Sequence, residues 1–206
     1  MKILITGACG YVGTELTNEL LNKKKIIALD TMWFGNYLKN HKNLKIVKSD
    51  VRNFDHKILK KVDVVVHLAN IANDPSAELN KELSWDVNVL GTLRLIELSI
   101  KYKVKKFIYA SSGSVYGISK KKKVTEDTEL LPISLYNKTK MVAEKILLNY
   151  QNRIKLFIVR PATVCGISKR MRFDTVVNDL TQQSFKTKLT VFGGKQIRPN
   201  LHIKDM

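Results

Sequence analysis

Two side chains that could share acid–base chemistry lie four positions apart, Tyr136 and Lys140. In a helix this spacing places both on one face. An ammonium group near a phenol stabilises the phenolate, which lowers a tyrosine pKa that is ordinarily about 10. Tyr136 would then exchange protons near neutral pH. The pair alone is a weak indication, because a tyrosine and a lysine at this spacing also occur by chance on helix surfaces.

A run of small hydroxyl residues stands upstream of this pair. Ser111, Ser112 and Ser114 directly follow the apolar segment 107–110, which is predicted to be a buried strand. Ligands of parallel sheets bind at the carboxyl ends of the strands. The hydroxyl groups are therefore candidates for hydrogen bonds to a substrate oxygen, with an ordinary serine-rich turn as the alternative.

A glycine-rich segment connects the first predicted strand to the first predicted helix. Its glycines are Gly7, Gly10 and Gly13. Such glycines allow a tight turn and a close approach of the backbone to a pyrophosphate at the helix N-terminus. Asp30 ends the second strand, 23 residues after Gly7. A carboxylate there accepts hydrogen bonds from the adenosine ribose and repels a 2′-phosphate, so NAD is favoured over NADP; a capping aspartate in a turn is the alternative.

Short apolar strands alternate with helical patterns along residues 1–165. This alternation predicts an α/β fold with a doubly wound parallel sheet of the Rossmann type. The strand–helix alternation ends before residues 166–206. We interpret these residues as the beginning of a smaller, truncated C-terminal substrate-binding module. The predicted strands are 3–5, 26–30, 44–47, 62–68, 107–110, 156–159 and 189–192, and the predicted helices are 11–21, 76–101, 134–150 and 173–183.

Composition excludes several classes of protein. No apolar run approaches the roughly 18 residues of a membrane span, and the two cysteines and four histidines show no zinc-site spacing, so no metal is expected. The N-terminus lacks the apolar stretch of a signal peptide, which favours the cytoplasm. The net charge is +18, with 29 lysines and only 7 arginines. The lysine clusters at 23–25, 105–106 and 120–123 carry no interleaved aromatic residues and no nucleic-acid-binding motif, so no specific nucleic-acid partner is expected.

Together these motifs resemble the extended short-chain dehydrogenase/reductase family, in its NAD-dependent nucleotide-sugar epimerase/dehydratase branch. The similarity runs in order from Met1 to Met206. Its motifs fall on the glycines and Asp30 named above, and on Asp50–Val51, His67–Ala69, Asn88–Thr92, Ser112, Tyr136, Lys140, Arg160–Val164 and Val191–Asp205.

The resemblance implies roles for particular residues. Ser112, Tyr136 and Lys140 would be catalytic, and Ser112 and Arg198 would contact a nucleotide-diphosphate sugar. Asn178 is a further candidate for a substrate contact, with an ordinary polar face of its helix as the alternative. The run Asn70–Pro75 either lines the substrate cleft or forms a plain turn. The resemblance also implies a homodimer formed through the helices near 76–101 and 134–150. The cofactor-binding positions would be Gly7, Gly10, Tyr11, Val12, Gly13, Asp30, Asp50, Val51, Leu68, Ala69, Asn88, Ser111, Tyr136, Lys140 and Pro161.

One departure from the family pattern bears on the reaction. Dehydratases of this branch usually carry an Asp-Glu pair directly after the catalytic serine or threonine, where this chain has Gly113 and Ser114. Neither side chain exchanges protons near pH 7, so an epimerase acting through a keto-sugar is expected. A nucleotide-sugar reductase or dehydrogenase, or a truncated NAD-binding protein with little activity, are the alternatives. Relatives continue beyond the Asp205 region, so the chain reads either as a fragment or as a shortened homologue.

Overall fold

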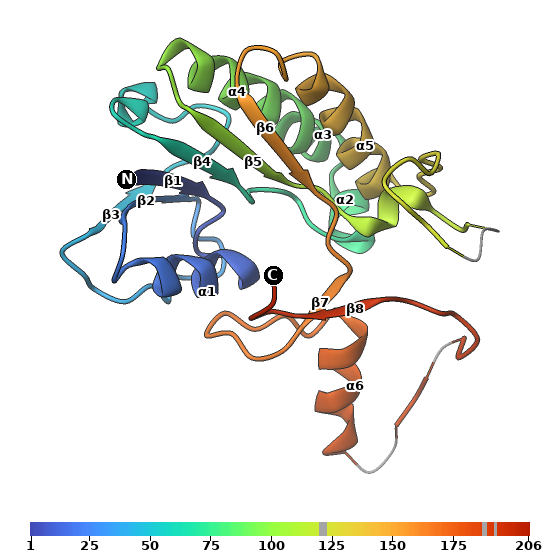
Figure 1. Cartoon of the computed structure of the whole chain (residues 1–206). Coiled ribbons are helices and arrows are strands. Elements are labelled where there is room, and N and C mark those ends of the chain that lie inside the picture. Colours follow the sequence, from blue (N-terminus) through green and yellow to red (C-terminus); the bar gives the residue numbers. More distant parts are fainter. Residues whose placement is uncertain (120–122, 187–188, 192) are drawn as a thin grey trace.

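A computed structural model of the chain describes residues 1–119, 123–186, 189–191 and 193–206. Most of the lysine cluster 120–123 lies outside these residues. Six parallel strands form one sheet in the order β3-β2-β1-β4-β5-β6 (Figure 1). The strands are β1 (Lys2–Thr6), β2 (Lys25–Asp30), β3 (Leu44–Lys48), β4 (Val64–His67), β5 (Lys106–Ala110) and β6 (Lys155–Val159). The predicted doubly wound Rossmann-type sheet is confirmed.

Alternate residues of the central strands bury against opposite layers. Leu4 packs in a core with Leu95 and Leu147 of the helices on one face, whereas Ile5 packs with Leu21 on the other. The first layer holds α4 (Gly91–Lys101) and α5 (Leu135–Leu148), and the second holds α1 (Tyr11–Leu20) (Figure 1). The order of the strands reverses between β1 and β4, and a crevice that accepts ligands opens at such a reversal.

The long helix predicted at 76–101 is interrupted in the structure. It is divided into α2 (Asp74–Leu79), α3 (Lys81–Trp85), a π-helical turn at Asp86–Leu90, and α4. Asn80 is extended, and its side chain accepts a hydrogen bond from the Leu83 backbone N–H, which starts a new helix. The prediction of one continuous helix is wrong because a polar residue with capping geometry stands inside the apolar pattern.

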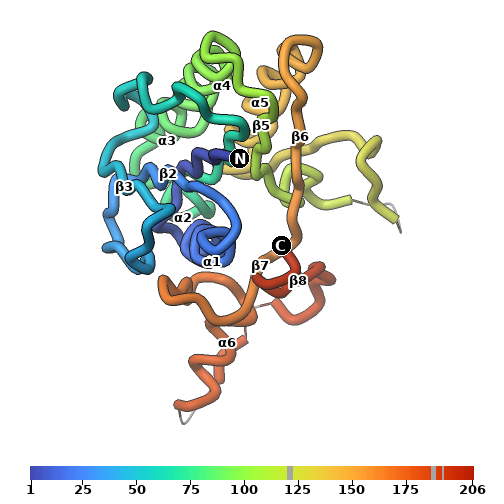
Figure 2. Tube along the Cα trace, turned by 60° about the vertical axis from the view of Figure 1, so that its left-hand side comes forward, coloured from blue at the N-terminus to red at the C-terminus, as the bar shows by residue number. Residues whose placement is uncertain are grey.

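The C-terminal part forms a small layer beside the sheet, where β7 (Thr163–Cys165) pairs in parallel with β8 (Asn200–His202) (Figure 2). Helix α6 (Val176–Ser184) replaces the predicted helix 173–183. The strand predicted at 189–192 is wrong for residues 189–191, which have no regular structure, and residue 192 lies outside the described residues. The division into parts at 165/166 stays a prediction.

Candidate functional site

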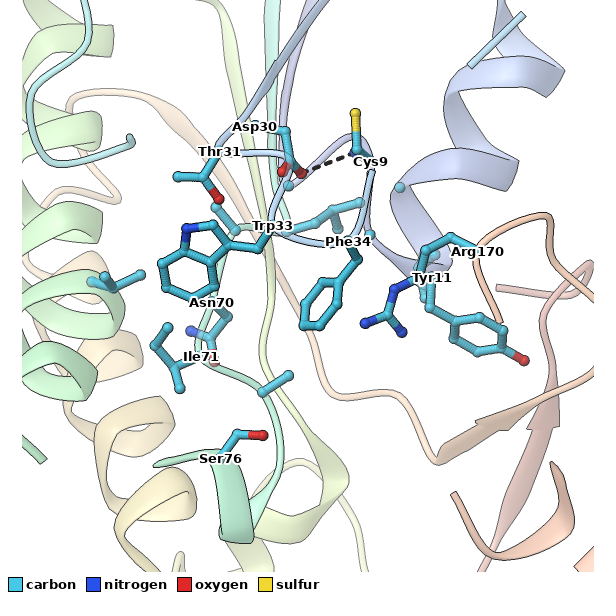
Figure 3. A pocket seen from close by; sticks show the side chains of 18 of the residues that line it. Cys9, Tyr11, Asp30, Thr31, Trp33, Phe34, Asn70, Ile71, Ser76 and Arg170 are labelled. Carbon is cyan, nitrogen blue, oxygen red and sulfur yellow. Dashed lines mark hydrogen bonds between the residues drawn. The ribbon is translucent and has the colours of Figure 1, made fainter. Parts of the chain in front are cut away.

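A cavity of about 860 Å³ opens at the carboxyl ends of β1, β2 and β4, beside the N-terminus of α1 (Figure 3). It is the place where a doubly wound fold receives a dinucleotide. Ten of the residues predicted to bind the cofactor line it, namely Gly7, Gly10, Tyr11, Val12, Gly13, Asp30, Asp50, Val51, Leu68 and Ala69.

The glycines of the first turn are fixed by close backbone packing. Gly7 has φ +71°, and a Cβ there would lie 2.6 Å from the backbone nitrogen of Ala69. A Cβ on Gly13 would lie 2.1 Å from the carbonyl oxygen of Gly7. Gly10 precedes α1 and makes no side-chain cap, so the first-turn N–H groups, in residues that line the cavity, have no capping side chain. The turn therefore fits a pyrophosphate, which such N–H groups bind.

Asp30 is held in place by the backbone. One carboxylate oxygen accepts the Cys9 N–H at 2.9 Å and the other accepts the Met32 N–H at 2.7 Å. A carboxylate oxygen has a second lone pair, so each remains able to accept a ribose hydroxyl. This arrangement fits the adenosine ribose of NAD.

Asp50 lies farther along the cavity wall and is fixed by a two-point ion pair with Arg52, at 3.0 and 2.8 Å. The Arg52 hydrogen bonds hold the pKa of the Asp50 carboxyl below its ordinary value. The backbone beyond it continues into Val51, which is buried and also lines the cavity. The cofactor-binding position predicted at Asp50–Val51 thus has a rigid polar and apolar pair.

Tyr136 and Lys140 lie on one face of α5, whose N-terminus is capped by the Ser134 side chain through the Asn137 N–H. Lys140 is buried and donates to the carbonyl oxygen of Ala110, at the end of β5, at 2.6 Å. Its ammonium lies 5.8 Å from the centre of the Tyr136 ring and 4.8 Å from that of Tyr109. The helix thus brings a phenol and an amine together at the carboxyl edge of the sheet, beyond the residues that line the cavity.

Burial shifts both groups away from their charged forms. It lowers the pKa of Lys140 to about 7, against which the charge of Glu144 acts. It also raises the pKa of Tyr136 to about 12, which the nearby Arg172 charge and a hydrogen bond with Ser112 partly offset. Without ligand, Tyr136 is therefore neutral at pH 7, and Lys140 titrates near this pH.

The serine run forms a hydroxyl network in front of Tyr136. Ser112 Oγ lies 2.7 Å from Ser114 Oγ, and the Ser114 hydroxyl donates to Asn137 Oδ1 at 2.5 Å. Gly113 is close to the Pro161 carbonyl, which its N–H donates to at 2.8 Å. Positions 113 and 114 therefore present backbone and a hydroxyl, with no carboxylic acid.

A buried ion pair supports the same helix from behind. Glu144 is 1% exposed and lies one turn beyond Lys140, and its carboxylate pairs with Arg160 at 2.7 Å. Arg160 also donates to the Tyr116 hydroxyl at 2.7 Å. This pair ties α5 to the end of β6 and to the turn after Ser112. Sequence reasoning did not find it, because its members are 16 residues apart and belong to different elements.

Several predicted positions serve as supports. Asn88 is buried, and its amide bonds the Ile71 backbone and the Thr139 hydroxyl, so it joins the turn after β4 to α5. His67 is buried between the hydroxyls of Thr6 and Thr92, and burial lowers its pKa to about 3. No cluster that could hold a metal exists among the described residues.

The other predicted residues lie outside the cavity lining. Ser111 is buried, and its hydroxyl has no partner among the described residues. Asn178 is buried and bonds Gly166 N, Arg172 O and the Tyr11 hydroxyl. Arg198 is exposed, and Pro161 follows β6 at the edge of the serine turn. Their contacts with cofactor or sugar stay predictions.

The segment after β7 closes one side of the cavity. The Tyr11 hydroxyl donates to Gly166 O at 2.6 Å, and Ser168 Oγ donates to Tyr11 O at 3.0 Å. Farther along, Arg172 holds Asp174 at 2.9 and 2.7 Å, and Asn73 donates to the same carboxylate. Within the run Asn70–Pro75, residues 70–73 line the cavity, and the Asn73 side chain also caps α2.

Among the lining residues that were missed from the sequence are two aromatic side chains and an arginine. Trp33 and Phe34 project into the cavity from the loop after β2, and Arg170 faces them from the C-terminal part (Figure 3). The signal for the aromatic pair was its place directly after Asp30. No local signal identified Arg170, because its partner is 136 residues away.

No helix among the described residues is long and apolar enough to cross a membrane.

Known proteins resemble the whole of this chain. It is 37% identical to an uncharacterised UDP-glucose epimerase of Bacillus subtilis (strain 168), an alignment that covers 100% of this chain and 70% of the relative. A UDP-glucuronic acid 4-epimerase from Bacillus cereus, solved with UDP-glucuronic acid and NAD, superposes with a TM-score of 0.88 at 32% identity, covering 99% of this chain and 70% of that one. A UDP-N-acetylglucosamine 4-epimerase from Methanobrevibacter ruminantium M1 gives a TM-score of 0.90 at 26% identity, covering 98% and 69%.

The same family appears in the sequence match and in the geometry. Residues 3–206 match the NAD dependent epimerase/dehydratase family. The phosphate turn, the fixed Asp30 and the Tyr136–Lys140 pair occupy the positions that the motifs indicated, around a cavity suited to NAD. The chain belongs to the NAD-dependent epimerase/dehydratase family, and its cofactor is NAD.

Proposed function

We propose that this protein is a nucleotide-sugar epimerase that acts through a keto-sugar intermediate. The observation that carries the proposal is the combination of Ser112, Tyr136 and Lys140 at the edge of β5 with no carboxylic acid at positions 113 and 114. The relatives named above are epimerases of UDP-sugars, which supports a nucleotide-diphosphate sugar as substrate.

The residues divide the work of proton transfer. Tyr136 would take the proton of a sugar hydroxyl as the carbon beside it is oxidised, and return it when the carbon is reduced. Lys140 would hold the phenolate by its charge, and Ser112 would fix the reacting oxygen by a hydrogen bond. Bound NAD would supply the hydride acceptor and donor. The keto-sugar would rotate between the two hydride transfers, so that the hydride returns to the opposite face of the same carbon. The cofactor would thereby be regenerated.

Elimination of water requires an additional acid and base next to the sugar. Gly113 and the Ser114 hydroxyl, which donates to Asn137, cannot supply them near pH 7. The proposed reaction is therefore epimerisation and not 4,6-dehydration.

We further propose a homodimer formed on the outer surfaces of α4 and α5, in a reducing cytoplasm. The described outer surface of this region exposes Leu90, the last residue of the π-helical turn before α4, at 56% accessibility, and Leu148 of α5 at 44%, beside charged residues. Such a mixed surface suits a helix–helix contact between copies. Light scattering on the purified protein checks the mass of the particle.

The reaction is tested by incubating the purified chain with NAD and UDP-glucose, UDP-glucuronic acid or UDP-N-acetylglucosamine in separate samples. The expected result is an epimer visible by proton NMR, with no net change in NADH absorbance. Steady NADH accumulation would identify a dehydrogenase instead. Tight NAD binding without turnover of any of these sugars would contradict the epimerase proposal and leave a cofactor-binding protein.

A further inference from the structure

Arg170, from the C-terminal part of the chain, contacts the loop after β2 at the cavity. Its guanidinium carbon is 4.0 Å from the centre of the Phe34 ring, a stacked cation–π contact. Its Nη1 donates to the neighbouring Met171 carbonyl at 3.0 Å. Among the described residues it forms no ion pair with a carboxylate. The side chain is therefore a half-buried cation whose charge has no direct counterion in the protein.

The other charges of the described cavity lining are already paired or assigned. Arg172 pairs with Asp174, and Asp50 pairs with Arg52. Asp30 accepts two backbone N–H groups and faces the ribose position. Arg170 thus remains as the one lining cation, within the part of the chain that the structure describes, that is free to meet an anion. Burial and the nearby charge of Arg172 lower the pKa of Arg170 from the ordinary arginine value, and the charges of Asp174 and Asp30, which lie nearby without a direct ion pair, offset this only in part.

The position of Arg170 relative to the phosphate turn is fixed by the backbone. Ser168, two residues earlier, is buried and donates to the carbonyl of Tyr11, the first residue of α1. Figure 3 shows the Arg170 side chain beside Tyr11 and Phe34. The turn at residues 7–13 contains no basic side chain. A dinucleotide pyrophosphate carries two negative charges, which the N–H groups there meet only as partial charges.

We propose that Arg170 binds the pyrophosphate of the dinucleotide and, stacked on Phe34, closes the cavity over it as a clasp. The two halves come from segments that are far apart in the sequence and meet over the phosphate turn. Release of the cofactor then requires the Arg170–Phe34 contact to separate. The proposal concerns cofactor binding and goes beyond epimerisation, so it stands or falls independently of the sugar reaction.

The test measures binding of three probes, NAD, ADP and adenosine, by isothermal titration calorimetry. Arg170→Met keeps the length of the side chain and removes its charge. It is expected to raise the Kd of NAD and of ADP about tenfold, the usual size for loss of one charge-assisted hydrogen bond, while the Kd of adenosine changes less than about twofold. The Kd values of Arg170→Lys for NAD and ADP are expected to lie between those of the wild type and those of Arg170→Met. Phe34→Leu is expected to speed NAD release, which stopped-flow displacement measures.

A matched control removes an arginine that stacks on an aromatic ring elsewhere. Arg153 lies 5.7 Å from the centre of the Tyr150 ring, outside the cavity, so Arg153→Met should leave all three Kd values unchanged. Salt provides a second readout, because the wild-type affinity for ADP should fall more steeply with ionic strength than that of Arg170→Met. Equal weakening of adenosine and ADP binding in Arg170→Met would overturn the proposal. Unchanged NAD binding would also overturn it, and a further titration with UDP-glucose would then show whether Arg170 binds the sugar nucleotide instead.

Discussion

The two ends of the ligand cleft are built differently. At the cofactor end the backbone sets the geometry, since both Asp30 oxygens accept main-chain N–H groups and no Cβ fits at Gly13. At the reacting end the geometry is in place but the charges are displaced, with burial shifting the pKa of Tyr136 to about 12 and that of Lys140 to about 7. One end depends on shape, and the other depends on charge.

The physical reason lies in what each end must do. The adenosine and pyrophosphate part of the dinucleotide keeps its charge throughout the reaction, so a rigid set of donors and acceptors suffices to hold it. A proton moves at Tyr136 during the reaction, so the cost of charging that site has to change as ligands arrive. Burial raises this cost, and any nearby charge then has a large effect. Substitutions at the two ends should therefore have effects of different kinds.

The largest effect is expected from Lys140→Met on the pH dependence of stability. Lys140 has a pKa of about 7 when folded, against the ordinary lysine value of 10.5. Unfolding therefore takes up a proton between these values, so the stability of the wild type falls as the pH falls through this window and levels off below pH 7. The Lys140→Met variant does not lose stability in this way. As the pH is lowered from 10.5 to 7, the free energy of unfolding of the variant should therefore rise relative to that of the wild type by on the order of 5 kcal/mol.

Urea denaturation at several pH values measures this difference. Lys138→Met, on the exposed side of the same helix, is the control and should follow the wild-type curve. Parallel curves for Lys140→Met and the wild type would show that Lys140 keeps an ordinary pKa and that the reacting end is not a charge-sensitive site.

The next effect is expected from Tyr136→Phe, which removes the proton-transferring hydroxyl and little else. Turnover of the sugar nucleotide should fall about 10³-fold, in the range for loss of a general acid–base group, with the Kd of NAD within about twofold. Tyr109→Phe is a matched control, since the Tyr109 hydroxyl is buried without a partner among the described residues and its ring stays under Lys140. Comparable loss of NAD binding in Tyr136→Phe would erase the distinction between the two ends.

Gly13→Ala is expected to act at the cofactor end alone. The added Cβ would meet the Gly7 carbonyl oxygen at 2.1 Å and force the phosphate turn open, so the Kd of NAD should rise about 100-fold. Gly10→Ala is the milder companion, because its Cβ would lie 3.2 Å from the same oxygen and Gly10 has a φ of −74° that alanine adopts. Calorimetry measures the Kd of NAD for both variants. An equal rise of this Kd in Gly13→Ala and Gly10→Ala would contradict a site that is determined by its shape.

Sequence reasoning reached the parts of the cleft that depend on short-range spacing. The phosphate turn, Asp30 and the Tyr136–Lys140 pair each lie within one strand–turn–helix unit or one helix, so their relative positions follow from local geometry. The six-stranded sheet followed from the alternation of apolar strands and helices. These features are local, and local patterns specify them.

The remaining features depend on long-range folding. Arg170 meets Phe34, and Arg160 meets Glu144, only after the chain has folded, and nothing beside these residues in the sequence indicates the contact. The helix break at Asn80 was not predicted, because an asparagine that caps a helix and an exposed asparagine inside a helix look the same in the sequence. The displaced pKa values were missed for a related reason: the i,i+4 spacing predicted stabilisation of the phenolate, whereas burial, which spacing does not report, is the larger influence.

Asp30→Ser should have the smallest effect and refines the cofactor end most closely. Loss of the carboxylate removes two acceptors for the ribose hydroxyls, so the Kd of NAD should rise about tenfold, while the Kd of NADP should fall because its 2′-phosphate is no longer repelled. Asp127→Ser removes an equal charge from an exposed position and controls for the general gain in positive charge. If both variants changed the two affinities alike, the preference for NAD would come from net charge. A reversal confined to Asp30→Ser would show that the preference comes from the carboxylate at this position, which the Cys9 and Met32 N–H groups orient.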